Sequence, residues 1–330
     1  MITYLTQFFT TMKKLLVIAL LCVCALSAHA IENAKCYLQH DGNVTTFERS
    51  AIAEAIEAAV KGDVLYLGEG SYPGFTLNKE ITVRGAGAEK TIINSNVTIS
   101  IPGLPELKQE LLVGLSCSSI ELLSAMSGVS INKCNFYNFN VLAINNDILI
   151  NSCYCTNNLY FKSYIKGLTV LNSKINKVTT YNDSNGYSIS TDGNVSTFIN
   201  CNICWLYNYS NQINGTFINC IVENYYYSNY FYSCIFINTL SVFEFTIAST
   251  SSMQECYTDT KFTFDNCECS YDTNTLTTKG YLGNDGTVVG IYGGSNPYTL
   301  ELNVPRITSS KIALDRENKI LNVNLKVTSK

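Results

Sequence analysis

The sequence has few of the residues that enzymes most often use for catalysis. Charged residues make up 15% of the 330 residues, against about a quarter in an average domain, and there are only two histidines. Arginine is missing between Gly85 and Pro305, and the six aspartates between residues 97 and 280 are separated from one another in sequence. Acid–base pairs and serine–histidine nucleophiles therefore have few candidates, and we predict no catalytic residue in this chain.

Metal, cofactor and nucleic-acid sites also lack their usual residues. A structural zinc site needs four converging ligands, but the chain has one Cys-x-x-Cys pair, Cys201 and Cys204, and only His40 after its leader. We predict no metal and no cofactor. Without the leader, 20 basic and 26 acidic residues remain, which argues against nucleic acid as a partner. A base could still come from the lysines at 162, 166, 174 and 177, although such a group is typical of a solvated surface.

Only one apolar run is long, and it lies near the start of the chain. Lys13 and Lys14 precede the run over residues 15–25, and Ala28-His29-Ala30 follows it. This order is that of a secretory signal peptide, and the run is shorter than the ~20 residues of a membrane-spanning helix. We expect residues 1–30 to be removed and the mature protein to be exported to the periplasm, the cell surface or the medium, without a transmembrane segment.

Against this sparse background, one six-residue pattern recurs. It reads apolar, any residue, Asn or Ser, Cys, any residue, apolar, and its clearest copies are Phe198–Ile203, Phe217–Val222 and Phe231–Phe236. Located by its Cys, or by the Ser that replaces it, the pattern occurs at Cys134, Cys153, Ser173, Cys201, Cys220, Cys234 and Cys267. Steps near 20 residues are typical of a solenoid with one loop of variable length per turn. The step of 14 before Cys234 is too short for a full turn, so the register there stays open.

The pattern describes a corner between two strands. An inward apolar side chain is followed by Asn, which tolerates a left-handed backbone, and then by an inward Cys. Stacked turns would place the cysteines in one row and Asn172, Asn200, Asn219 and Asn266 in another, with hydrogen bonds along the Asn row. Turns about 4.8 Å apart are within reach of a disulfide, but parallel side chains point the same way. Free buried thiols are therefore favoured over the disulfides that an exported chain could form.

The region after the leader resembles a known family. A helical pattern over about residues 46–60 precedes GDVLYLGEGSY, residues 62–72, and FTLNKEITVRGAGAEKTII, residues 75–93. This order resembles the start of the pectin lyase-like proteins, whose fold is a single-stranded right-handed parallel β-helix with a helix capping its N-terminal end. The resemblance implies an all-β solenoid over residues 63–280, preceded by a lead-in and capping helix over residues 31–62.

Residues 281–330 have a different character. The glycine-rich stretch DGTVVGIYGG, residues 285–294, resembles the tail segment of secreted β-helix proteins from Bacteroidetes-type bacteria. Residues 307–314 and 319–327 alternate between apolar and polar and predict a β-hairpin. We expect this region to form a β cap that covers the last turn and blocks pairing at its edge.

Aromatic residues after two of the repeats are the candidate glycan-binding residues. They are Trp205, Tyr207, Tyr209, Tyr225, Tyr227, Tyr230 and Tyr232. Because side chains alternate along a strand, Tyr207 and Tyr209 would share one face of their strand, and Tyr225 and Tyr227 would share one face of theirs. Stacked turns would gather these rings and hydroxyls into a surface that suits sugars. Strands also favour such residues for packing alone.

Three functions are therefore open. The favoured one is a non-catalytic protein that is surface-associated or binds glycans. The second is a polysaccharide-active enzyme, either a pectate lyase-like lyase or a glycoside hydrolase. For such an enzyme the resemblance implies clustered aspartates with a basic residue or calcium, and these have no counterpart in the sequence. The third is a structural or adhesin module.

Overall fold

The computed structural model describes residues 35–298 and 306–328 with internal gaps. The gaps are residues 102, 104–105, 108, 144, 162–164, 181–195, 208–214, 227–229, 232–233, 243–245, 248–250, 260–263, 266–267, 270–271 and 316–319. Described side chains also exclude those of residues 166, 180, 207, 224–226, 230–231, 246–247, 264–265, 268–269 and 306–328. The chain forms two compact units, Met1–Tyr298 and Thr299–Lys330.

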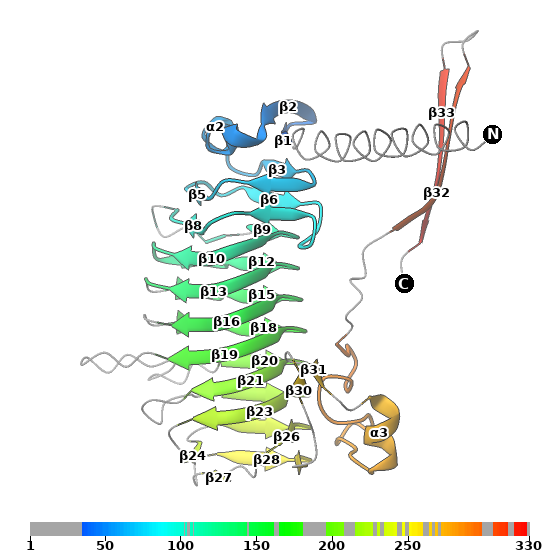
Figure 1. Cartoon of the computed structure of the whole chain (residues 1–330). Coiled ribbons are helices and arrows are strands. Elements are labelled where there is room, and N and C mark those ends of the chain that lie inside the picture. Colours follow the sequence, from blue (N-terminus) through cyan, green and yellow to red (C-terminus); the bar gives the residue numbers. More distant parts are fainter. Residues whose placement is uncertain are drawn as a thin grey trace, which may run out of the picture. The chain divides into compact units, whose positions relative to one another are not determined.

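The first unit is a right-handed parallel β-solenoid of about eight turns, which confirms the predicted fold class (Figure 1). Sheet A runs in the order β2 (Asn43–Glu48), β1 (Lys35–His40), β3 (Val64–Leu67), β6 (Thr82–Gly85), β9 (Leu112–Val113), β12 (Ser130–Asn132), β15 (Leu149–Asn151), β18 (Thr169–Leu171), β20 (Ser196–Ile199), β22 (Gly215–Ile218), β25 (Ile235–Ile237) and β28 (Ser252–Gln254). From β3 onward, all of its neighbouring strands are parallel.

Sheet B stacks the second strand of each turn. Its main path is β4 (Gly70–Tyr72), β7 (Thr91–Ile93), β10 (Ser116–Leu122), β13 (Asn135–Val141), β16 (Tyr154–Phe161), β19 (Lys174–Thr180), β21 (Asn202–Tyr207), β23 (Ile221–Tyr226), β26 (Leu240–Ser241) and β29 (Tyr257–Thr258). Two further strands, β5 (Phe75–Leu77) and β8 (Val97–Ile99), pair with each other, and β8 also pairs with β10. A small parallel sheet C holds β11 (Met126–Ser127), β14 (Asn145–Asn146) and β17 (Ile165–Lys166). The other elements of this unit are the strand pairs β24 (Tyr230–Phe231) with β27 (Thr246–Ile247) and β30 (Phe264–Asp265) with β31 (Glu268–Cys269), and the helix α3 (Thr273–Thr278).

A left-handed residue turns the chain from sheet A into sheet B. Successive turns place these corner residues in a row, with φ between 46° and 66°: Gly114, Lys133, Ser152, Asn172, Asn200, Asn219, Asn238 and Glu255. Glycine and asparagine adopt this conformation more easily than other residues do. Asn172, Asn200 and Asn219 thus lie at corners, where the repeat placed them, and Asn266 lies outside the described residues.

Leu115 follows the corner at Gly114, and the residue after each of the other seven corners is small and can donate a hydrogen bond. This row holds Cys134, Cys153, Ser173, Cys201, Cys220, Thr239 and Cys256. The Sγ of Cys220 donates to the carbonyl oxygens of Ile218 and Phe198, both at 3.3 Å. The Oγ1 of Thr239 donates to the equivalent oxygens one turn later. The position therefore selects a small donor rather than sulfur, which explains why Ser and Thr replace Cys.

The register corrects the place of Cys234. Phe217 lies opposite Phe236, so the place after the corner that follows Cys220 belongs to Thr239. Cys234 is buried elsewhere in the turn, just before β25. The row cysteines with described side chains are free thiols, whereas Cys204 of the Cys-x-x-Cys pair is in a disulfide whose partner lies outside the described side chains. Cys267 also lies outside the described residues.

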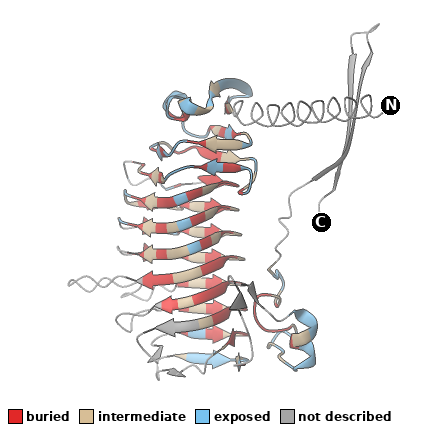
Figure 2. Ribbon diagram, viewed as in Figure 1, coloured by how far each residue is buried: buried red, intermediate tan, exposed pale blue. Residues whose placement is uncertain are grey.

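Three phenylalanine rings stack in the core of the later turns. The rings of Phe198, Phe217 and Phe236 occupy one column of sheet A, with successive centroids 5.0 and 4.9 Å apart. All three side chains are fully buried, and burying each ring contributes about 1.5–3 kcal/mol. Figure 2 shows this buried interior continuing through the stacked strands.

The N-terminal residues differ from the prediction. Thr46 to Glu48 pair with β1 in an antiparallel hairpin, so they are strand rather than helix. The chain turns through a 3-10 segment, Arg49–Ala51, into the short helix α2 (Ile52–Ala58). Ile52, Ala55 and Ile56 join the solenoid core, whereas Val60, which the helical pattern placed on the same face, is exposed.

Residues 279–298, here called the strap, lie along the side of the solenoid. Lys279 Nζ lies 3.0 Å from a carboxylate oxygen of Asp259, and the ring of Tyr281 stacks on that of Tyr257. Further along, Asn284 exchanges hydrogen bonds with the side chain of Asn238. These contacts fasten the first part of the strap to the last turns of the solenoid.

The second half of the strap continues over earlier turns. Asn200 Nδ2 donates to the carbonyl oxygens of Ile291 and Gly293, at 3.1 and 2.8 Å. The strap's Val288, Val289 and Ile291 form a small apolar cluster with Ile221 and Leu240. The sequence predicted an end cap and hydrogen bonds along the Asn row. The amides of Asn200 and Asn238 bond to the strap rather than along the row, while the end cap stays a prediction.

The second unit contains the antiparallel hairpin β32 (Arg306–Asp315) and β33 (Ile320–Thr328). Its strands match the residues predicted from alternation. In the part of the chain that the structure describes, no helix combines the length and apolarity that a membrane span requires.

Candidate functional site

Two adjoining grooves mark the outer surface of the first turns. The Tyr137 groove has a volume of about 510 Å³ and crosses β7, β10 and β13, reaching Thr156 of β16. The α2 groove has a volume of about 600 Å³ and lies between α2 and the strands β5 and β8. They meet at Asn94 and Ser95, where the chain passes from β7 towards β8.

The Tyr137 groove combines apolar surface with neutral hydrogen-bonding groups. The side chain of Tyr137 is 55% exposed and that of Ile92 is 43% exposed. The remaining wall includes Ser116, Ser119 and Asn135, and none of the residues that line the groove is charged. Such a surface disfavours an ionic ligand and suits a neutral molecule with both apolar faces and hydroxyl groups.

A β-bulge lies beside Tyr137, which points outward because it follows the buried Phe136. The register between β13 and β16 shifts after Phe136, so that Thr156 and Asn157 lie opposite the single residue Tyr137. Phe136 and Phe139, three residues apart, are both buried, which breaks strict alternation. Bulges redirect side chains and are frequent beside functional sites.

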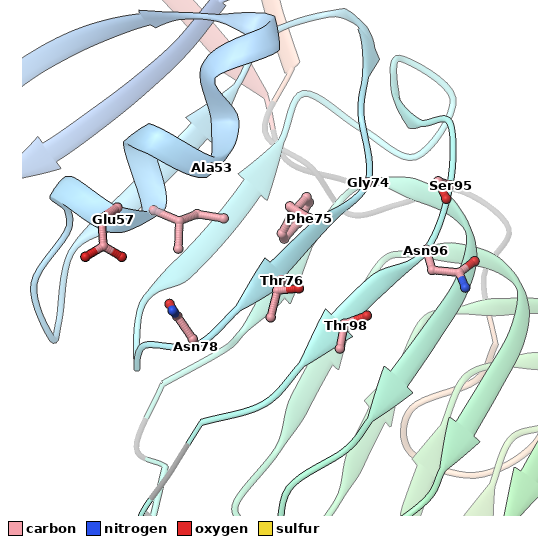
Figure 3. Close-up of a pocket in the computed structure, with 10 residues that line it drawn as sticks. Ala53, Glu57, Gly74, Phe75, Thr76, Asn78, Ser95, Asn96 and Thr98 are labelled. Atoms are coloured by element: carbon pink, nitrogen blue, oxygen red, sulfur yellow. The ribbon is translucent and has the colours of Figure 1, made fainter.

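The α2 groove is also polar and contains one carboxylate. Thr76 and Thr98 lie in register on neighbouring strands, and Glu57 approaches from α2 (Figure 3). Glu57 lies 3.9 Å from the ammonium group of Lys79. On the far side, Asn96 donates to Glu121 at 3.1 Å. Asn96 is itself at the groove, and Glu57 is the one acidic residue that lines it.

Thiol chemistry is disfavoured at the buried cysteines of the described turns whose pKa is raised. Burial raises the pKa of Cys134 and of Cys155 to about 12, and it raises the pKa of Cys117, at the floor of the Tyr137 groove, well above its ordinary value. A protonated thiol is neither a good nucleophile nor a metal ligand. Among the described residues, no group of three His, Cys, Asp or Glu side chains could hold a metal ion.

The structure describes only part of the predicted aromatic cluster. Trp205 is half-buried on β21, in register with Lys177 and Asn224. Tyr207 is in register with Tyr226, a residue that the sequence did not single out, whereas Tyr225 is in register with the buried Leu206. The side chains of Tyr207, Tyr225 and Tyr230 are not described, and Tyr209, Tyr227 and Tyr232 lie outside the described residues.

The described lysines and aspartates of the body lie on different elements of the fold. Lys174 and Lys177 belong to sheet B and Lys166 to sheet C, while Lys162 lies outside the described residues. Asp147 occupies a left-handed corner, and Asp272 caps α3 by accepting from Thr275. The members of this set that the structure describes therefore do not gather into one site.

The sequence search missed Tyr137 because it followed runs of aromatic residues. The available signal was the interval between Phe136 and Phe139, which does not fit uninterrupted alternation. Comparison with protein families, with curated proteins and with solved structures finds no match for this chain.

Proposed function

We propose that this protein is an exported, non-catalytic β-solenoid that binds neutral glycans on the outer surface of its first turns. The observation that carries the proposal is the Tyr137 groove, where an exposed ring lies among uncharged hydroxyl and amide groups. Sugar rings present C–H faces that pack on aromatic rings, and their hydroxyls exchange hydrogen bonds with Ser, Thr and Asn. Export rests on the leader over residues 1–30, and kinship with pectin lyase-like solenoids rests on the resemblance over residues 62–93.

The absence of ionic groups from the groove supports binding rather than turnover. Glycoside hydrolysis uses two carboxylates about 5–10 Å apart, and Glu57 is the only carboxylate among the residues that line the neighbouring α2 groove. Buried thiols supply no nucleophile, as argued above.

One observation favours the enzyme alternative. Burial raises the pKa of Glu223 on β23, which is the property of a general acid. A Glu223→Gln variant would lose any hydrolytic activity that the wild type shows on a glycan it binds.

A glycan array of the purified protein tests the proposal, with depolymerisation assays on the same glycans. We expect neutral glycans to bind and to stay intact. Tyr137→Ala should weaken binding by about 1–2 kcal/mol, or about five- to thirtyfold in Kd. Tyr66→Ala is the matched control, because Tyr66 is 39% exposed on β3 of sheet A. Equal binding by both variants, or cleavage of any bound polymer, would refute the proposal.

A further inference from the structure

The two grooves on the first turns adjoin where the second strand of each turn is interrupted. β4 and β5 are the two halves of one such strand and β7 and β8 of the next, whereas β10 runs unbroken over seven residues. The interruptions pack closely, because a Cβ on Gly74 would lie 2.7 Å from the backbone oxygen of Asn96. Asn94 lines the Tyr137 groove, and the next residue, Ser95, lines the α2 groove. A ligand that leaves one groove across residues 94 and 95 therefore enters the other.

On the side of the later turns, the surface that continues the Tyr137 groove is covered. One column of sheet B joins these turns through strand register, and it contains Ile92, Ser116, Asn135, Tyr154, Lys174, Asn202, Ile221 and Leu240. Ile92, in the groove, is 43% exposed, whereas Lys174 is 7% exposed. Ile221 and Leu240 are fully buried and belong to the apolar cluster that the strap completes. A ligand in the Tyr137 groove can therefore extend towards α2, but not along this column towards the strap.

The α2 groove offers hydrogen-bonding groups of the same kind as the Tyr137 groove. Thr76 and Thr98 lie in register, with Asn96 beside them (Figure 3). Their hydroxyl and amide groups both donate and accept hydrogen bonds. Glu57 adds a carboxylate that accepts from hydroxyl groups, and the ammonium group of Lys79, 3.9 Å away, offsets its charge. Both grooves therefore suit the hydroxyl groups of successive units in one neutral chain.

The combined length of the grooves sets the size of the ligand. From β5 through β8, β10 and β13 to β16 there are four strand spacings of about 4.8 Å, or about 19 Å in all. An extended chain of pyranose rings advances by a similar distance per unit, so about four to five units match this span. We propose that the ligand is a linear neutral oligosaccharide of this length, which binds to Tyr137 at one end and to the α2 groove at the other. This proposal rests on the proposed function, because the Tyr137 groove has to bind a glycan first.

A chain-length series tests this proposal. The full protein is titrated calorimetrically with the dimers and the pentamers of β-1,4-linked glucose, β-1,4-linked mannose and α-1,4-linked glucose. We expect at least one pentamer to bind about tenfold more tightly than its dimer, a factor that one or two added hydrogen bonds supply. Binding by none of the three pentamers would overturn the proposal, whereas the glycan array decides separately whether the protein binds glycans at all.

Two arginine variants locate the added binding. Thr76→Arg puts a long side chain into the α2 groove, and Thr45→Arg puts the same side chain on β2, outside both grooves; both threonines are exposed. Thr76→Arg should lower the affinity for the pentamer to that for the dimer and leave the affinity for the dimer unchanged. Thr45→Arg should change neither, and an equal Tm would show that both variants fold. Equal affinity of the wild type for dimer and pentamer, or a pentamer advantage that survives in Thr76→Arg, would overturn the proposal while leaving glycan binding at Tyr137 in place.

Discussion

Replacing Gly294 with alanine should loosen the strap, and Gly286 provides a control with the same backbone geometry. Both glycines have a φ of 77°. A Cβ on Gly286 would meet nothing within 4 Å, whereas a Cβ on Gly294 would overlap the side-chain amide of Asn219. Asn219 is 5% exposed and lies at a corner, so its amide has little room to move. The difference between the two variants therefore isolates the close contact from backbone strain.

The magnitude follows from the contacts near Gly294. Alanine in a left-handed conformation costs about 1–2 kcal/mol, and this applies to both variants. In Gly294→Ala the strap must also shift away from the Asn row. The shift would weaken the hydrogen bonds from Asn200 to Ile291 and Gly293, worth about 0.5–1.5 kcal/mol each. We expect Gly286→Ala to lower the free energy of unfolding by about 1–2 kcal/mol and Gly294→Ala by about 2–5 kcal/mol.

Urea unfolding measures the total effect, and hydrogen exchange locates it. The amide of Gly290 donates to the carbonyl of Asn238 at 2.8 Å, so its exchange reports release of the strap. It should exchange faster in Gly294→Ala than in Gly286→Ala, while amides in the middle strands of sheet A keep their protection. Equal destabilisation and equal exchange in the two variants would refute the strap contacts.

Three further predictions concern the solenoid and its first strand. Cys220→Ser should change stability by less than about 1 kcal/mol, whereas Cys220→Ala, which removes the donor to two carbonyls, should cost about 1–3 kcal/mol in thermal unfolding; equal losses would contradict the donor role. Because burial raises the pKa of Cys134 and Cys234 to about 12, these thiols should react with a disulfide reagent at pH 8 only after denaturation, and rapid labelling of the native protein would disprove their burial. The hydrogen bond to Asp63, 2.8 Å from Nδ1, raises the pKa of His40 above 6.5, so its stabilisation is complete below pH 6.5 and is lost as pH rises through the folded pKa. The gap in Tm between wild type and His40→Gln should therefore shrink from pH 5.5 to pH 8.5, and a constant gap would speak against the pair.

The repeat predicted the solenoid because its signal is local. An inward apolar residue, a left-handed corner and an inward small residue lie within six positions, and each turn has to satisfy the same geometry. Asn200 and Asn219 could therefore be placed at corners without knowledge of distant contacts. The same locality led to the mistake at Cys234. Six residues there match the pattern, but the pairing of Phe217 with Phe236 gives the corner to Asn238 and the row to Thr239.

The candidate site was less accessible to sequence reasoning. Tyr137 points outward because it follows the inward Phe136, but the groove around it depends on which residues of the neighbouring turns lie beside it. That in turn depends on strand register, including the bulge at which Thr156 and Asn157 oppose Tyr137. The sequence predicted that stacked turns would gather the tyrosines of two repeats, but it gave no register between those repeats. The structure places Tyr207 beside Tyr226.

By itself, the sequence determined the class of fold, the corners and the burial of the row cysteines, because these depend on a short pattern repeated every turn. Tertiary structure alone decided where the strap docks and which tyrosine is exposed in a groove. Each of these depends on contacts between distant residues, such as Asn200 with Gly293, 93 positions apart. No local periodicity encodes them, because the strap and the bulge beside Tyr137 do not recur in every described turn.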